Sequence, residues 1–319
     1  MQSSAMSKII VILLIQAGSA QILGTFHQSF RTDQPGQLTV ENRSGDIRII
    51  GTEGPQVEVT GTVVKKKIKN LFGHRQESVQ ELLDHPPLSW KDGNLTVQKI
   101  DRDLAEFVRV NYTIAVPPDM RVHCATGAGD LHIAALNYPI QVSTGAGDVE
   151  LNDLKGGGEV STGSGDMSGS RVNGDLTLST GSGNIVLTGC AGYCKIETGS
   201  GDIHLTYDDQ GQCRVKTGSG NIDIEKLMGG ADVSTGSGDI QATGYPLDVW
   251  DFRTGSGDVN VDIHPDAGAN LDLHSYSGSI QVEPQVEVVS SGHRHLEGIL
   301  RGGGPKVTVS TASGDISIQ

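Results

Sequence analysis

The sequence predicts a parallel β-solenoid, an all-β fold in which the chain winds in successive coils around a narrow apolar core. Two observations support this prediction. A glycine-rich motif, seen for example at residues 234–240 (STGSGDI), recurs at a fixed period, and apolar residues alternate with polar ones on both sides of it. The composition agrees with the prediction, because 44 glycines and only 4% aromatic residues leave few bulky side chains for a deep pocket.

The period of the motif is 18 or 19 residues, which is typical of a solenoid with one coil per repeat. We interpret the first glycine of each copy as a structural turn residue that allows a sharp corner. These glycines are Gly127, Gly145, Gly163, Gly181, Gly199, Gly218, Gly236 and Gly255. Weaker copies at residues 44–47, 275–280 and 311–316 extend the pattern over most of the chain.

Each copy of the motif is flanked by two short strands with one buried face. Around Gly145, for example, Val142 lies three residues before and Val149 four residues after, with polar residues between the apolar positions. Stacked coils about 4.8 Å apart would then form aliphatic ladders. We prefer a right-handed winding because parallel crossovers are usually right-handed, although a coil of this length is also compatible with left-handed forms.

Five segments follow one another along the chain. Residues 1–20 are typical of a signal peptide, with Lys8, an apolar run over 9–15, and small residues before a cleavage point after Ala20. Residues 21–64 are expected to form N-terminal β coils, and residues 65–90 an insertion with a short helix near 75–83, ending before Pro86. The regular solenoid is expected over 91–283, and a C-terminal excursion with loops and a closing coil over 284–319.

Charge and targeting signals restrict the partners. The net charge of −14 would repel nucleic acid and anionic membrane surfaces. No segment beyond the signal peptide approaches the length of a membrane span, so we expect no transmembrane segment after cleavage. The sequence therefore predicts an exported protein of the periplasm, the cell surface or the medium.

Several stretches together resemble a known family. Residues 40–47 (VENRSGDI), residues 112–117 (YTIAVP), the serial TGSGDI copies and residues 295–319 are similar to the bacterial putative-adhesin family of exported β-solenoid proteins. The resemblance covers about residues 35–319. It implies an exported or envelope-associated protein, and it supplies no catalytic residues.

The motif does not predict a phosphate-binding loop, because each copy leads into a strand and not into a helix. The acidic position that follows its second glycine is a candidate calcium column, consisting of Asp130, Asp148, Asp166, Asp202, Asp239 and Asp258. Asn184 and Asn221 occupy the same column, so the favoured interpretation is a ladder of turn-stabilising side-chain oxygens. No cofactor is expected apart from this calcium alternative.

Threonines before the turn, such as Thr144 and Thr162, have the inward parity of Val142 and Val160. An ice-binding array would need threonines that point outward, so this function is disfavoured.

Four cysteines occur, and two of them occupy one column. Cys194 and Cys213 both precede a motif glycine by five residues, so they should lie on adjacent coils within disulfide range. A bridge between them is one expectation, and free buried thiols are the other. Cys124 and Cys190 are expected to be core thiols.

Candidate catalytic and metal-binding residues are sparse. His293 and His295 could project together and bind a metal, with His264 and His274 in nearby coils, but a solvated loop is the favoured interpretation. For polysaccharide cleavage the candidates are Asp223, Asp232, Asp251 and Arg253, which appear scattered over several coils. One aromatic patch, Tyr245, Trp250 and Phe252, could stack on a sugar or fill a wider coil.

We conclude that the sequence predicts a non-catalytic structural or binding protein of the bacterial cell envelope, with an adhesive role as one form of this function. The partner would be an envelope protein or a glycan that the sequence does not identify. A carbohydrate-active β-helix enzyme and a calcium-dependent binding module are the alternatives.

Overall fold

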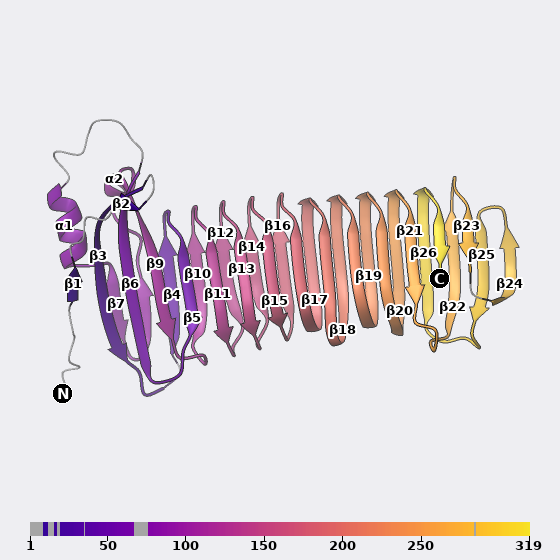
Figure 1. The fold of residues 1–319 in the computed structure, drawn as a ribbon, viewed down its shortest axis with the longest axis horizontal. Helices are drawn as coiled ribbons and strands as arrows, with labels where there is room; N and C mark the ends of the chain where they lie inside the picture. The colour runs from indigo at the N-terminus through magenta and orange to yellow at the C-terminus, as the bar shows by residue number, and fades with distance from the viewer. Residues whose placement is uncertain (1–8, 12–15, 18–19, 35, 67–75, 284) are drawn as a thin grey trace. The chain divides into compact units, whose positions relative to one another are not determined.

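The computed structural model describes residues 9–11, 16–17, 20–34, 36–66, 76–283 and 285–319. The chain divides into two compact units, residues 1–163 (unit 1) and residues 164–319 (unit 2). Nearly all regular structure is β, and the predicted β-solenoid is confirmed in each unit by parallel strands that pair at the coil period. Figure 1 shows the succession of strands within each unit.

Unit 1 contains fourteen described strands and two helices. They are β1 (Ile9–Val11), β2 (Gln16–Ala17), β3 (Ala20–Arg31), β4 (Gln37–Asn42), β5 (Ile47–Gly51), β6 (Gln56–Lys65), α1 (Gln76–Asp84), β7 (Leu88–Lys91), β8 (Asn94–Val97), α2 (Arg102–Ala105), β9 (Val108–Val116), β10 (Arg121–Thr126), β11 (Leu131–Leu136), β12 (Ile140–Thr144), β13 (Val149–Leu154) and β14 (Gly158–Thr162).

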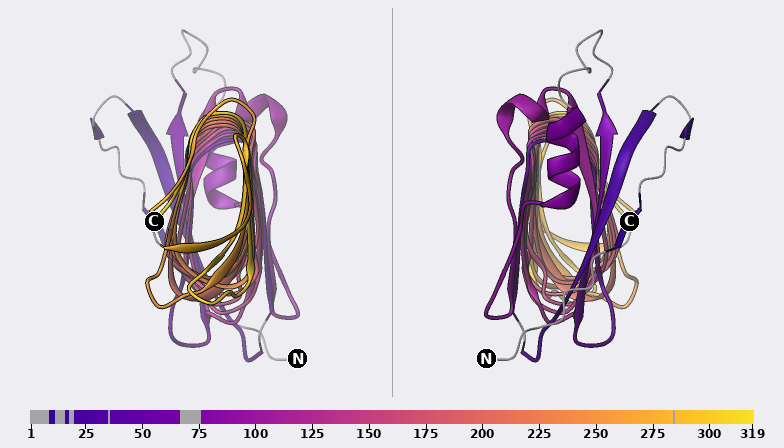
Figure 2. Two further views of the ribbon diagram at one scale, coloured as in Figure 1. Left: turned by 90° about the vertical axis from the view of Figure 1, so that its right-hand side faces the viewer. Right: turned by 90° about the vertical axis from the view of Figure 1, so that its left-hand side faces the viewer.

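Unit 2 consists of thirteen strands in its described residues. They are β15 (Met167–Val172), β16 (Leu176–Thr180), β17 (Ile185–Ser200), β18 (Ile203–Ser219), β19 (Ile222–Ser237), β20 (Ile240–Ser256), β21 (Val259–Ile263), β22 (Ala269–Ser275), β23 (Ile280–Val282), β24 (Val286–Gly292), β25 (His295–Leu300), β26 (Lys306–Ser313) and β27 (Ile316–Ile318). In Figure 2 the coils of this unit, drawn in pink through orange to yellow, are seen end-on as narrow loops with two long sides.

The alternation predicted from the sequence sets the core. In β18, Ile203, Leu205, Val215 and Thr217 are buried, while residues that alternate with them, such as Arg214 and Lys216, are exposed. Register follows the repeat, since Ile185 pairs with Ile203 and Ile203 pairs with Ile222 on successive strands. Each coil therefore adds one rung to several aliphatic ladders, which is how a repeat that cannot bury its own apolar face becomes stable in a stack.

The N-terminal strands do not stack in sequence order. The coil formed by β4 and β5 pairs in parallel with β10 and β11 on one side and with β8 and β9 on the other. Strands β8 and β9, which follow β5 in the sequence, therefore lie on the side of this coil that is opposite β10 and β11. Beyond them, β9, β6 and β3 pair with one another as an antiparallel sheet. Helix α1 buries Val79, Leu82 and Leu83, and Leu83 packs against the backbone of Gly24 in β3. The short α2 is a second helix that the sequence did not indicate.

The predicted signal peptide, residues 1–20, falls largely outside the described residues. Strand β3 begins at Ala20, so cleavage after this residue would leave the rest of the strand intact. Neither helix among the described residues is long and apolar enough to cross a membrane.

The C-terminal excursion is a β-hairpin where the sequence indicated loops. Strands β24 and β25 pair antiparallel, and β25 also pairs antiparallel with β22. The last coil is inserted out of order, because β26 pairs with both β20 and β22, and β27 pairs with both β21 and β23. The hairpin of β24 and β25 therefore forms the edge of this sheet next to β22, and the last coil of the sequence lies between β20 and β22.

Candidate binding face on the C-terminal unit

The glycine corners are structural, and their two glycines are needed for different reasons. The second glycine of each motif has a positive φ, for example +147° at Gly238. The first glycine, Gly236, has no such φ, but a Cβ there would lie 2.5 Å from the carbonyl oxygen of Gly218 in the preceding coil. Coils approach so closely at this corner that no side chain fits.

The aspartate and asparagine column forms an inter-coil ladder. Oδ1 of Asp239 accepts a hydrogen bond from the backbone N–H of Asp258 at 2.8 Å, and Oδ1 of Asn221 accepts one from Asp239 at 2.9 Å. The same contact joins Asp130 to Asp148 at 3.0 Å. Each side-chain oxygen therefore accepts a hydrogen bond from the next coil and not from its own turn. The sequence indicated a turn-stabilising ladder, and the structure shows that the ladder joins successive coils. Either residue type fits, because only a short side-chain oxygen is required.

We expect Asp239→Asn to leave stability within about 0.5 kcal/mol of wild type and Asp239→Ala to cost about 1 kcal/mol, since only alanine removes the acceptor. Denaturant unfolding with and without millimolar calcium would measure both effects. A calcium column predicts the opposite pattern, in which Asp239→Asn abolishes a calcium-dependent rise in stability.

The threonine column points inward, as the parity predicted. Thr217 and Thr235 are buried, and their hydroxyls donate to the carbonyls of Gly201 at 3.2 Å and Gly220 at 3.0 Å. Each threonine thus satisfies the carbonyl of a corner glycine in the preceding coil. An outward array suited to ice is not formed by these residues.

The four cysteines are buried and carry free thiols. Cys194 and Cys213 are register partners on β17 and β18, which places them on adjacent coils as expected. No bridge joins them in the structure, where both thiols are free, and a hydrogen bond from Cys190 is the main reason that the pKa of the Cys194 thiol is lowered. Burial raises the pKa of the Cys213 thiol and raises that of Cys124 to about 12, so both are inert at neutral pH.

Two rows of polar side chains run across the outward face that β16 to β20, β26, β22 and β25 share in unit 2. We call this surface the polar face. Its first row is Thr177, Lys195, Arg214, Asp232, Asp251, Thr308, Asp272 and Glu297, in order of strand pairing. Its second row is Ser179, Glu197, Lys216, Ser234, Arg253, Ser310, His274 and His295.

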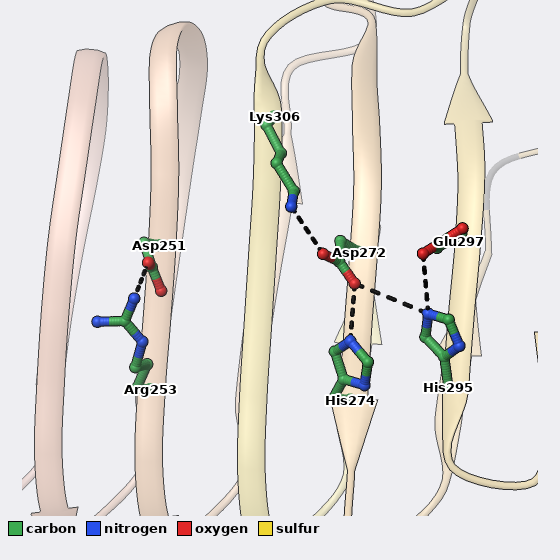
Figure 3. Close-up of polar contacts among 7 residues, drawn as sticks. All are labelled: Asp251, Arg253, Asp272, His274, His295, Glu297 and Lys306. Atoms are coloured by element: carbon green, nitrogen blue, oxygen red, sulfur yellow. Dashed lines mark hydrogen bonds and ion pairs between the residues drawn. The ribbon is translucent and has the colours of Figure 1, made fainter.

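The polar face brings together three of the four candidate catalytic residues. Asp232 and Asp251 are opposite each other on β19 and β20, and Arg253 forms ion pairs with both (Figure 3 shows the pair with Asp251). Arg214 adds a second ion pair to Asp232 at 2.8 Å. The expectation that these residues are scattered is therefore wrong for these three. Asp223 lies on the first half of β19, opposite His204.

The two carboxylates of this cluster differ in their surroundings. Desolvation is the main reason that the pKa of Asp251 is raised, and one of its oxygens is buried without a hydrogen-bond partner. Asp232, in contrast, is held by two guanidinium groups. Asp251 is also ion-paired with Arg253, so guanidinium groups contact both carboxylates in the structure.

The histidines of the polar face come from β22 and β25. His274 and His295 are directly opposite each other with stacked rings, 4.4 Å between centroids, and Asp272 lies beside them (Figure 3). His293 lies in the turn between β24 and β25, and His264 contacts Tyr245 elsewhere in the unit. In the structure His295 therefore lies beside His274, which the sequence placed in a nearby coil, and not beside His293.

Two pockets adjoin these strands. One, of about 450 Å³, is lined on the polar face by Tyr193, Arg214, Asp232, Asp251 and Arg253. The other, of about 550 Å³, lies at the irregular bends of the coils and is lined by Tyr207, Met228, Tyr245 and His264 among others.

The predicted aromatic patch is not a surface feature. Trp250 and Phe252 are fully buried and pack edge to face at 5.8 Å, so they fill a wider coil, and only Tyr245 lines a pocket.

Comparison with known proteins agrees with the fold. The model of a family described as Toastrack DUF4097, a solenoid-like fold, matches residues 36–319. No curated protein matches the chain.

Three of the solved structures that match the chain come from Parabacteroides, Bacteroides and Clostridium, all with TM-scores below 0.5. A "putative lipid binding protein" of Parabacteroides distasonis has 12% identity and a TM-score of 0.41, with 92% of this chain and 96% of that one covered. A "putative adhesin" of Bacteroides fragilis has 11% identity, a TM-score of 0.35 and coverages of 92% and 97%. A "putative cell adhesion protein" of Clostridium sporogenes has 9% identity, a TM-score of 0.22 and the same coverages. At these scores no function is transferred to this chain.

Proposed function

This chain belongs to the Toastrack DUF4097 family, and we propose that it is a non-catalytic binding protein exported to the bacterial cell envelope. The observation that carries the proposal is the polar face of unit 2. Stacking at the strand spacing turns single polar residues into two continuous rows, and solenoids use extended surfaces of this kind to hold long ligands.

Charge varies along the polar face in a way that suits a polymer or protein partner with both charge signs. Lys195, Arg214 and Lys216 lie on β17 and β18, whereas Asp232, Asp251 and Asp272 lie on the strands that follow in pairing order. Arg214 and Lys216 are exposed at the basic end of the face. An envelope glycan or an envelope protein could contact both ends at once, and an adhesive role would follow from such contacts.

The test uses a double variant of the polar face and a control of equal charge. Lys195→Gln with Lys216→Gln removes two cations from the face, while Lys155→Gln with Lys226→Gln removes two exposed cations from elsewhere on the chain. We expect wild-type protein to retain a ligand from a panel of purified envelope glycans and envelope proteins, and the face variant to bind it at least 10-fold more weakly. The control should bind as wild type.

Failure to bind any member of the panel would remove the support for a binding role. Equal losses in the two double variants would show that net charge, and not the polar face, determines retention. Turnover of a glycan in the panel would favour the enzyme alternative instead.

A further inference from the structure

Four side chains at the end of the polar face form a square on two strands. In the antiparallel pair of β22 and β25, Asp272 is opposite Glu297 and His274 is opposite His295. Residues two apart on a strand point to the same face, and side chains directly opposite each other have Cβ atoms about 5 Å apart. Figure 3 shows these four side chains projecting from the two strands toward one another.

Three potential ligand atoms converge within the square. Nε2 of His274 lies 2.8 Å from Oδ1 of Asp272, and Nε2 of His295 lies 3.7 Å from the same oxygen. One ligand atom from each of the three residues lies within 4.8 Å of those of the other two. Ligands at about 2.0–2.1 Å from a tetrahedral zinc ion are about 3.3 Å apart, a value between the two distances measured here.

The environment of Nε2 of His295 is a second, independent indication that a cation binds here. Its Nε2 is buried and has no hydrogen-bond partner, although carboxylate oxygens of Asp272 and Glu297 lie 3.7 and 3.5 Å away. Such an atom is costly to bury, and each case in a native protein calls for an explanation. A cation between this nitrogen and the two carboxylates would complete its coordination.

Lys306 fixes the carboxylate without blocking the convergence point. Its ammonium lies 2.8 Å from Oδ2 of Asp272, while both histidines face Oδ1. This ion pair holds Asp272 with Oδ1 on the side of the two histidines. Contacts of this type from outside the ligand set orient a metal-binding side chain.

We propose that Asp272, His274 and His295, with Glu297 as fourth ligand, bind a divalent transition-metal ion of the zinc type. Two imidazole nitrogens and two carboxylate oxygens are a donor set that Zn²⁺ accepts and that Ca²⁺, which prefers oxygen ligands, does not favour. Since the ligands come from β22 and β25, the ion would join the C-terminal hairpin to the coil beside it.

A second group, His204, Asp223 and Glu225, also has three converging ligand atoms. There, however, Nδ1 of His204 is hydrogen-bonded to Asp223 and Nε2 is in contact with Thr206 at 3.3 Å, so neither ring nitrogen is unpartnered. This group serves as an internal comparison.

The test is Zn²⁺ titration of the purified full chain by calorimetry, with three single variants. We expect one equivalent of Zn²⁺ to bind to wild type, and His295→Ala to weaken binding at least 10-fold. His293→Ala, two residues away in the adjacent turn, and His204→Ala, in the second group, should bind as wild type. The proposal is overturned if His295→Ala binds as tightly as wild type, or if His293→Ala or His204→Ala loses as much affinity.

A spectroscopic readout on wild type removes the dependence on variant folding. Co²⁺ in place of Zn²⁺ should give the visible absorption of a four-coordinate site, and Zn²⁺ should shift the ring NMR signals of His274 and His295 but not of His293. A purely six-coordinate Co²⁺ spectrum, or shifts at His293 alone, would contradict the assignment. Neither result depends on binding of an envelope ligand, so this proposal can fail while the proposed function stands.

Discussion

Gly238→Ala is expected to destabilise the protein by about 3 kcal/mol, a larger loss than at most surface positions. Gly238 has a φ of +147°, where a side chain is strained. A Cβ at this position would also lie 2.2 Å from the carbonyl oxygen of Gly220 in the preceding coil. Relief of that clash requires the two coils to separate, which would disturb the hydrogen bonds on both sides of the corner.

Denaturant unfolding of a glycine series would check this expectation. Gly236→Ala should cost less than Gly238→Ala, because its Cβ meets a carbonyl oxygen at 2.5 Å but its φ is not positive. Gly292→Ala is the matched control, since nothing lies within 4 Å of its Cβ and its φ is not positive. Equal losses of stability at all three positions would mean that the general difference between glycine and alanine, and not the corner geometry, determines the loss.

The coil itself could be predicted from the sequence because one physical cause repeats. Each corner needs glycine, and each strand needs alternation, so Val142 and Val160 occupy equivalent places without any knowledge of their neighbours. The presence of Asn184 and Asn221 among aspartates also pointed correctly to a hydrogen-bonding column.

The order of the coils could not be predicted in the same way. Strand β26 carries Val307 and Val309 in the alternation that any coil would have, so it can pair with either β20 or β22. Aliphatic ladders do not specify a unique neighbour, because their packing is non-directional. The out-of-order insertion of β26 therefore left no signal that an analysis of periodicity can detect.

The histidine cluster was partly predictable. Asp272 and His274, like His295 and Glu297, are two residues apart, which indicates one shared face if both segments are strands. The sequence did not reveal that β25 runs antiparallel to β22 with His274 opposite His295. That register depends on a hairpin where loops were expected.

We expect Trp250→Ala to lower the free energy of unfolding by about 4 kcal/mol, a loss at least as large as that of Gly238→Ala. The Trp250 side chain is fully buried in unit 2, packs against Phe252, and donates a hydrogen bond from Nε1 to the carbonyl of Gly229 at 2.7 Å. Alanine would leave a cavity and also an unpaired buried carbonyl, so the two losses add.

Trp250→Phe separates these two contributions, because it keeps an aromatic ring but removes the N–H donor. We expect it to cost about 2 kcal/mol in denaturant unfolding, roughly half the loss of the alanine variant. Tyr276→Ala, at a side chain that is 73% exposed, should change stability by less than about 0.5 kcal/mol. If Trp250→Ala were as mild as Tyr276→Ala, Trp250 would have to be a surface residue, and the sugar-stacking patch excluded by its burial would again be a candidate site. A large loss would instead confirm that the Trp250 side chain belongs to the core, on the opposite side of the strand from its neighbour Asp251 on the polar face.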